Sequence, residues 1–298
     1  MSATGPESSP PVFAIGTGRC GTHFLAQLLA RERGVAAHHE RAPLSDAFHR
    51  YCVWNDLAVD DAGFVATKAA GIAADRAQGK LSFEASAFLT LSTPALHRAF
   101  GARFVLMVRR PDRVVNSLLA KGWYEHEPER IDPRLALGYQ AAGSKPHHAF
   151  SRLAAFGDEG ARWARLSRVG KLAYFWRALN EAALRDFAPL PENTTRLQLL
   201  ERFDHEAYVA LAQFAGFTPT LTRAALARIA GAKPGTRGRT PSVRDWSERE
   251  AADFEAEVAP LAERLGYSWR TAELRAEPAR GVEPRSSGAR LRSWLGGR

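Results

Sequence analysis

A glycine-rich stretch between an apolar run and an amphipathic segment constrains the fold of this chain more than any other feature. Residues 12–15 are apolar, and residues 16–23 read Gly-Thr-Gly-Arg-Cys-Gly-Thr-His. Residues 22–30 then place four apolar side chains on one helical face: Phe24, Leu25, Leu28 and Leu29. A loop in this position directs backbone N–H groups and the positive end of the helix towards one point. The stretch therefore predicts a strand, an anion-binding turn and a helix.

Further short apolar runs alternate with helical patterns along the chain. Strands are predicted at residues 64–68, 104–108 and 195–199, and helices at residues 88–100, after Pro111, and at residues 172–187, 204–214 and 247–265. Asp204 and Ser247 are the expected N-caps of the last two helices, and Glu250 has capping-box spacing from Ser247. This alternation is typical of parallel strands. It predicts an α/β fold in which helices flank a central parallel sheet.

The 298 residues, 45% of them hydrophobic, suffice for one large domain with a sizeable core. We expect this domain at residues 12–270, after a disordered N-terminus at residues 1–11. Residues 121–168 are rich in Arg, His and aromatic residues and predict a helical insertion, which serves either as a lid or acceptor-binding wall or as an ordinary surface excursion. Residues 275–298 predict a flexible basic tail.

The charge balance points to an anionic partner. The chain has 41 Lys and Arg against 32 Asp and Glu, which gives a net charge of +9. Such a surplus suits nucleic acid, a phospholipid surface or a small phosphorylated ligand. Residues 275–298 contain six Arg and two Glu, so almost half of the surplus lies in the predicted tail. This distribution favours a small ligand over a nucleic-acid-binding surface.

The ends of the chain and its cysteines bear on its compartment. The first residues lack the basic start and apolar run of a signal peptide, and dense apolar runs reach about five residues where roughly 20 are required to span a bilayer. Cys20 and Cys52 cannot build a disulfide framework, and no CxxC pair is present to bind zinc. We therefore expect a cytoplasmic protein without a transmembrane segment or a metal site.

The glycine-rich stretch is compatible with more than one nucleotide-binding loop. Gly16 and Gly21 have the spacing of a Walker A loop, but Thr22 and His23 follow where a nucleotide triphosphatase needs Lys and then Ser or Thr. The glycines also satisfy the dinucleotide fingerprint, with Glu40 as the acid about 20 residues later. That interpretation is weaker, because Glu40 follows no evident strand. The loop predicts instead a compact anion held by Arg19 without an obligatory metal.

A second anion site follows the strand at residues 104–108. Arg109 comes directly after this strand, and Ser117 lies eight residues further on, in the helix that Pro111 opens. Both side chains can converge on one phosphate, because ligands of α/β sheets bind at the carboxyl ends of the strands. Two such sites at neighbouring strand ends indicate a ligand with two separated anionic groups.

These motifs resemble those of sulfotransferases that use 3′-phosphoadenosine-5′-phosphosulfate (PAPS), in particular the bacterial and carbohydrate branches. Residues 16–22 are similar to the family's 5′-phosphosulfate loop, and Arg109 with Ser117 is similar to its 3′-phosphate pair. Residues 83–89, Phe-Glu-Ala-Ser-Ala-Phe-Leu, resemble its G-E-x-S-P-Y-L stretch. Residues 199–203 resemble its Y-E-D-L stretch, although Leu200 replaces the Tyr. With Trp246 and residues 265–267, the likeness covers residues 12–267.

The resemblance implies a three-layer, P-loop-like fold of sulfotransferase type and metal-independent transfer of a sulfuryl group from PAPS to a hydroxyl or amine. Arg19 stands where many members have Lys. The implied donor-binding residues are Gly16, Thr17, Gly18, Arg19, Cys20, Gly21, Thr22, His23, Arg109 and Ser117, together with Arg237 and Gly238 in a basic loop near the C-terminus. The alternatives are a P-loop kinase or phosphotransferase and a basic nucleic-acid-binding protein. The acceptor stays open among sugar, lipid, small-alcohol and peptide hydroxyls.

Sulfuryl transfer also needs a base that takes the acceptor's proton. Glu40, in His38-His39-Glu40-Arg41, stands after the first helix, where several family branches carry a catalytic Glu. His39 and Glu84 are the next candidates, and His23, beside the loop, is a fourth. We expect Glu40 to be the base and Arg19 to stabilise the leaving group.

Overall fold

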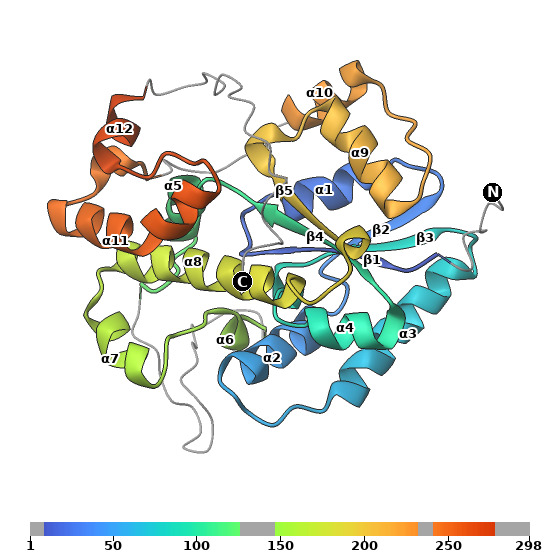
Figure 1. Cartoon of the computed structure of the whole chain (residues 1–298), viewed down its shortest axis with the longest axis horizontal. Coiled ribbons are helices and arrows are strands. Elements are labelled where there is room, and N and C mark those ends of the chain that lie inside the picture. Colours follow the sequence, from blue (N-terminus) through green and yellow to red (C-terminus); the bar gives the residue numbers. More distant parts are fainter. Residues whose placement is uncertain (1–8, 126–146, 232–240, 278–298) are drawn as a thin grey trace.

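The structure, a computed structural model, describes residues 9–125, 147–231 and 241–277 (Figure 1). Its strands are β1 (Val12–Gly16), β2 (Val35–His39), β3 (Leu81–Ala85), β4 (Arg103–Val108) and β5 (Thr195–Leu199). Its α-helices are α1 (Thr22–Leu29), α2 (Pro43–Trp54), α3 (Asp61–Arg76), α4 (Thr93–Phe100), α5 (Pro111–Leu119), α6 (His148–Ser151), α7 (Asp158–Arg165), α8 (Arg168–Phe187), α9 (His205–Ala215), α10 (Arg223–Gly231), α11 (Glu248–Arg264) and α12 (Thr271–Ala276). Short 3₁₀ turns are η1 (Ala87–Leu89), η2 (Glu192–Thr194), η3 (Leu200–Arg202) and η4 (Val243–Asp245).

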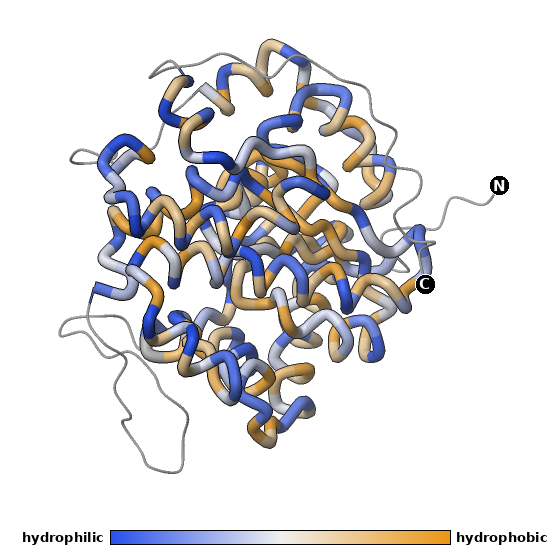
Figure 2. Tube along the Cα trace, turned by 60° about the vertical axis from the view of Figure 1, so that its left-hand side comes forward, coloured by the Kyte–Doolittle hydropathy of each residue, from blue (hydrophilic) through white to orange (hydrophobic). Residues whose placement is uncertain are grey.

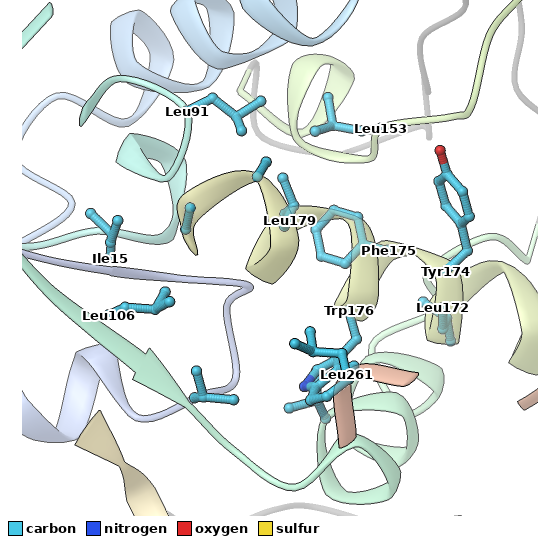
Figure 3. Packing of buried hydrophobic residues seen from close by; sticks show 14 of the residues in the cluster. Ile15, Leu91, Leu106, Leu153, Leu172, Tyr174, Phe175, Trp176, Leu179 and Leu261 are labelled. Atoms are coloured by element: carbon cyan, nitrogen blue, oxygen red, sulfur yellow. The ribbon is translucent and has the colours of Figure 1, made fainter. Parts of the chain in front are cut away.

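The strands form one parallel sheet in the order β2-β3-β1-β4-β5. Alternate side chains point to opposite faces of a strand, and in β1 Phe13 and Ile15 enter one core while Val12 and Ala14 enter another. The first core lies under α5, α8 and α11, where Figure 3 shows Ile15 and Leu106 of the sheet facing the helical side chains. The second lies under α1 and α9. The predicted α/β class with a parallel sheet between helical layers is confirmed.

Apolar residues concentrate along the strands and the inward faces of the helices, whereas the outer turns are mostly hydrophilic (Figure 2). All residues of β1 are buried, and β4 is buried from Phe104 to Val108. Such short, continuously apolar strands are the pattern expected of a parallel sheet covered on both faces. The pattern explains why β1 and β4 were identifiable in the sequence.

The predicted strand at residues 64–68 is wrong, because these residues lie inside α3. The helix begins after Asp60, whose side chain accepts a hydrogen bond from the Ala62 N–H, and its sequence is rich in Ala, the best helix former. Its buried side chains recur at helical spacing: Phe64, Lys68, Ile72 and Asp75. The predicted helix at residues 88–100 is divided into η1 and α4, with Pro94 in the first turn of α4.

Two strands, β2 and β3, were not predicted. β2 ends in two histidines, and β3 buries Ser82 and Glu84 among apolar residues, so neither has the apolar run of a buried strand. Glu84 is tolerated there because the Lys68 ammonium lies 2.9 Å from its Oε1 atom. The expectation that no strand precedes Glu40 is therefore wrong, since β2 ends at the residue before it.

The helix starts were predicted more reliably. Asp204 caps α9 by accepting a hydrogen bond from the Ala207 N–H at 2.8 Å. Ser247 and Glu250 form the predicted capping box of α11. The strand at residues 195–199 and the helices containing residues 22–29, 111–119 and 172–187 are also present.

The structure describes part of the predicted insertion and the first residues of the predicted tail. In the predicted insertion at residues 121–168, residues 126–146 lie outside the described ranges, while Tyr124 and Trp163 are buried in the core beside α8. Arg275 of α12 donates to the carbonyls of Val243 and Trp246, so the folded part extends beyond the predicted start of the tail at residue 275. No helix within the described ranges has both the length and the apolar character that a bilayer crossing requires.

Candidate functional site

The loop between β1 and α1 presents uncapped backbone N–H groups. Gly21 occupies the N-cap position of α1 with φ 107°, and Gly18 and Arg19 also have positive φ, 78° and 56°. A Cβ at Gly21 would lie 2.8 Å from Leu200 Cδ1, and one at Gly16 would lie 2.5 Å from the Met107 carbonyl oxygen. Glycine is therefore required at both positions, and the first-turn N–H groups of α1 can donate to an anion.

Thr90, which sequence reasoning missed, holds the start of this loop. Its hydroxyl donates to the Gly16 carbonyl at 2.6 Å and accepts from the Gly16 N–H at 3.2 Å. The Ala87 Cβ of η1 lies 3.5 Å from the position that a Cβ at Gly18 would occupy. The stretch after β3 thus fixes the loop. No local signal marks Thr90 in the sequence, because its partner is 74 residues away.

The other loop residues divide between interior and surface. Thr17 and Thr22 are buried, and Cys20 is fully buried, which raises the pKa of its thiol. A neutral, enclosed thiol is a packing group rather than a nucleophile. His23 is exposed on the first turn of α1.

The two predicted anion sites meet in space. Arg19 donates from Nε to Ser117 Oγ at 2.8 Å, and Arg109 donates from Nη1 to the Arg19 carbonyl oxygen at 3.1 Å. Trp176 of α8 fixes the backbone beside them by donating from Nε1 to the Arg109 carbonyl at 3.0 Å. Burial is the main reason that the pKa of Arg109 is lowered. The positive charges of Arg113 and Arg19 add to the shift, while the carboxylates of Glu201 and Asp112 oppose it. An anion placed between these guanidinium groups would relieve that repulsion.

The sheet topology places this cluster where α/β proteins bind ligands. β1 leads through α1 on one face of the sheet towards β2, whereas β4 leads through α5 and α8 on the other face to β5. The connections that leave the neighbouring strands β1 and β4 therefore lie on opposite faces of the sheet. Such a switch point opens a crevice at the carboxyl ends of the two strands. Arg19 follows β1, and Arg109 with Ser117 follows β4.

The order of the strands also separates the site from a dinucleotide-binding fold. In that fold the strand carrying the acid is next to the first strand, in the order 3-2-1-4-5-6. Here β3 lies between β1 and β2, so the strand that precedes Glu40 is two positions, or about 10 Å, from β1. The strand order thus disfavours a dinucleotide-binding loop. The expected absence of a strand before Glu40 is not the reason, because β2 is present there.

Candidate bases lie beside the loop. The rings of His39 and His23 meet edge to face with centroids 4.8 Å apart, and His39 Nε2 lies 3.9 Å from Glu40 Oε1. Burial, reinforced by His23, lowers the pKa of His39 to about 4, so the imidazole is neutral at pH 7. Glu40 has φ 49°, and its N–H donates to the Ala85 carbonyl at 3.1 Å.

Glu84, the third candidate base, is enclosed in a buried charge cluster. Lys68 Nζ lies 2.9 Å from Glu84 Oε1 and 2.7 Å from Asp46 Oδ2. The Arg41 N–H also donates to Glu84 Oε1, at 3.1 Å. Burial, only partly offset by Lys68, raises the pKa of Asp46 to about 7. Glu84 therefore already has charged and backbone partners that connect it to the segment after Glu40.

The remaining predicted residues, Arg237 and Gly238, lie outside the described residues. The residues that sequence reasoning missed around the site are supporting ones: Thr90 under the loop, and Lys68 and Asp46 beside Glu84. Lys68 had been placed in a predicted strand, and only the tertiary structure brings it to β3.

Comparison with known proteins gives distant likenesses. No protein-family model matches the chain, and no curated protein matches it. Among solved structures, the chain is similar to a sulfotransferase domain from the curacin biosynthetic pathway, with 12% identity and a TM-score of 0.48 over 87% of this chain and 98% of that one. It is also similar to a sulfotransferase domain from the Synechococcus PCC 7002 olefin synthase, with 15% identity and a TM-score of 0.46 over 90% and 99%. At these identities neither likeness assigns an activity to this chain.

Proposed function

We propose that this protein is a sulfotransferase that transfers the sulfuryl group of PAPS to a hydroxyl or amine of an acceptor. The observation that carries the proposal is the contact between the two anion-binding elements: Arg19 of the glycine loop bonds Ser117 at 2.8 Å, and Arg109 bonds the Arg19 backbone at 3.1 Å. A loop that holds one phosphate would not need this second pair of donors. Their convergence at the switch point suits a nucleotide with anionic groups at both its 5′ and 3′ positions.

The residues present fit this donor better than a nucleoside triphosphate. The glycines leave space for a close backbone approach, and the uncapped N–H groups of α1 suit a compact anion. Thr22 and His23 replace the Lys and Ser/Thr pair that binds triphosphate and Mg²⁺. When bound, PAPS supplies the sulfuryl group, and adenosine 3′,5′-bisphosphate leaves.

The chain's own residues are assigned to donor binding, to stabilisation of the leaving group and to proton transfer. We assign the N–H groups of the first α1 turn to the 5′ side of the donor and Arg109 with Ser117 to the 3′-phosphate. Arg19 lies between the two and stabilises the departing negative charge. As the bond from the acceptor oxygen to sulfur forms and the bond from sulfur to the 5′-phosphate oxygen breaks, the Glu40 carboxylate accepts the acceptor's proton. His39, neutral at pH 7, is the second candidate for that step.

Thermal-shift measurements test the donor assignment. Adenosine 3′,5′-bisphosphate is expected to raise Tm in a concentration-dependent way without Mg²⁺, and to do so more than ADP or NAD at equal concentration. Replacing Ser117 by Ala or Arg109 by Gln should weaken bisphosphate affinity by about tenfold or more, because each removes a hydrogen bond to a charged group. Arg98→Gln is the matched control, since Arg98 is a 68% exposed arginine on α4 that contacts none of these residues.

The competing classes give different results in the same assay. Mg²⁺-dependent stabilisation by ATP with no response to the bisphosphate would identify a kinase-like protein. Stabilisation by nucleic acid alone, with steep salt dependence, would identify a nucleic-acid-binding protein. Either result contradicts the proposal.

A further inference from the structure

An apolar groove begins beside Glu40. It has a volume of about 610 Å³ and is lined by Ala42, Pro43, Leu44, Ser45 and Phe48 of the α2 region and by Phe150 of α6. The volume lies within the usual range of sites for small organic ligands. None of these six lining residues carries a charge, in contrast to the arginines at the neighbouring strand ends.

Large apolar side chains are left open to solvent in this groove. Leu44 is 49% exposed and Phe48 is 42% exposed, although both belong to a helix whose opposite face is buried. Phe48 meets Phe150 edge to face at 5.1 Å, and Phe150 meets the buried Tyr51 at 5.4 Å. One exposed apolar residue needs no explanation, but here Leu44, Phe48 and Phe150 line the same depression together.

The groove lies next to the proposed reaction centre. Ala42 is two residues after Glu40, so their Cα atoms are at most about 7 Å apart. The left-handed backbone of Glu40, with φ 49°, marks the point where the chain turns from β2 towards α2. An acceptor lying in the groove would therefore have one end beside Glu40.

The walls of the groove are fixed relative to the donor loop. Arg50, fully buried two residues after Phe48 on α2, donates to the Ala87 carbonyl at 2.9 Å and to the Ser151 carbonyl at 2.7 Å. These bonds join α2 both to α6, which carries Phe150, and to η1, which lies against Gly18. The groove is thus formed before any acceptor arrives, and its alignment with the loop does not depend on side chains at the surface.

We propose that this groove binds the body of the acceptor and that the acceptor is a neutral alcohol with an apolar, alkyl-type body. This inference rests on the proposed sulfotransferase function. An acceptor with charged groups would lose their hydration in the groove without gaining partners. A sugar would leave its additional hydroxyls unpaired against Leu44, Phe48 and Phe150. An alkyl body instead gains free energy from each methylene that it buries.

The experiment compares acceptors of increasing apolar length. With PAPS as donor, kcat/KM is measured for ethanol, 1-butanol, 1-hexanol, 1-octanol and methyl glucoside. It is expected to rise by about fourfold per buried methylene until the groove is filled, with methyl glucoside no better than ethanol. Calorimetric titration of 1-octanol into the complex of protein and adenosine 3′,5′-bisphosphate should show binding with a negative heat-capacity change.

Variants connect this selectivity to the groove. Phe48→Ser is expected to lower kcat/KM for 1-octanol by about tenfold or more, to lower it much less for ethanol, and to leave the bisphosphate-induced rise of Tm unchanged. Leu44→Ser tests the same wall at a second position. Phe156→Ser is the matched control, because Phe156 is 51% exposed but does not line the groove.

The outcomes separate the two proposals. If the bisphosphate fails to stabilise the protein, the proposed function fails. If the bisphosphate binds but methyl glucoside outperforms 1-octanol, or the rate is independent of chain length, the apolar-acceptor inference is overturned and the proposed function stands.

Discussion

Glu40 combines an unusual backbone conformation with a place beside the glycine loop. Its φ of 49° costs a non-glycine residue about 1 kcal/mol or more, and the conformation is held by the bond from its N–H to Ala85 and by the next N–H, of Arg41, which donates to Glu84. Arg19, on the loop itself, is also left-handed, with φ 56°. Backbone strain of this kind persists where surrounding contacts determine it, and it concentrates at active sites.

We predict that Glu40→Gln lowers kcat by about 100-fold, because the amide cannot accept the acceptor's proton. The rise of Tm with adenosine 3′,5′-bisphosphate should be unchanged, since the side chain is assigned no donor contact. Single-turnover transfer of a radiolabelled sulfuryl group measures the first quantity. Glu206→Gln, at an exposed site on α9, is the control, and near-normal turnover in Glu40→Gln would exclude Glu40 as the base.

His39 couples stability to pH. Its pKa is lowered from 6.5 to about 4, chiefly by burial, so between those values the unfolded chain binds a proton that the folded chain does not. The stability contribution of the neutral imidazole is therefore complete above pH 6.5 and is lost as the pH falls towards 4. Because the side chain is 28% exposed, we expect a loss of about 1 to 2 kcal/mol over this range.

Urea unfolding at pH 7 and pH 4.5 measures this difference. His39→Gln should make the free energy of unfolding less dependent on pH in that interval. His97→Gln provides a comparison with a partly buried histidine on α4, which lies against the opposite core. An unchanged pH dependence in His39→Gln contradicts the prediction.

Lys68 joins three elements through one buried ammonium. It lies on α3, contacts Asp46 of α2 at 2.7 Å and bonds both carboxylate oxygens of Glu84 on β3 at 2.9 and 3.0 Å. Its side chain and those of both acids are at least 96% buried. The same elements hold the segment from Glu40 to the groove, so this cluster supports the site.

We predict that Lys68→Met lowers the free energy of unfolding by about 3 to 5 kcal/mol, because it leaves two buried carboxylates without their cation. Lys121→Met, at an exposed lysine, should change it by less than about 0.5 kcal/mol. Combining Lys68→Met with Asp46→Asn and Glu84→Gln should recover part of the loss, since no buried charge then lacks a partner. Urea denaturation provides all three values, and an effect of Lys68→Met no larger than that of Lys121→Met would show that the cluster is not stabilising.

At the scale of the whole molecule, the site depends on where the basic residues lie more than on how many there are. Arg19 and Arg109 come from the ends of adjacent strands, and Arg110 of the same cluster is neutralised by Asp112 and Glu277. Almost half of the +9 surplus lies in residues 275–298, which contain six Arg and two Glu. The charges at the strand ends are therefore the ones that we assign to the proposed donor.

Accordingly, a chain that ends at Glu277 should bind adenosine 3′,5′-bisphosphate with an affinity within about threefold of the full chain, because the proposed donor contacts come from Arg19, Arg109 and Ser117, which the truncation keeps. The truncation keeps Glu277 and its pair with Arg110. Calorimetric titration at 0.15 M salt measures the affinity. A loss of more than tenfold would place a donor contact in the removed residues.

The elements that were predicted correctly are those whose sequence patterns extend over only a few neighbouring residues. The glycine loop, the Arg109 and Ser117 spacing and the caps at Asp204 and Ser247 are set by neighbours in sequence, so their elements were predicted correctly. β2 and β3 were missed because histidines, Ser82 and Glu84 interrupt their apolar pattern. Residues 64–68 were assigned to a strand because a run as short as Phe64, Val65 and Ala66 does not distinguish a strand from a buried helical turn.

The sequence alone determined that an anion-binding turn follows a buried strand and that a second set of donors follows another, because turn, cap and strand signals act over a few residues. Only the tertiary structure decided that β1 and β4 are neighbours, which brings Arg19 to Ser117, and that Lys68 neutralises a carboxylate on β3. It also decided that Phe48 and Phe150 meet edge to face in the groove that begins at Ala42. Strand order and the packing of helices that are distant in sequence depend on burial of the whole core, which no short segment encodes.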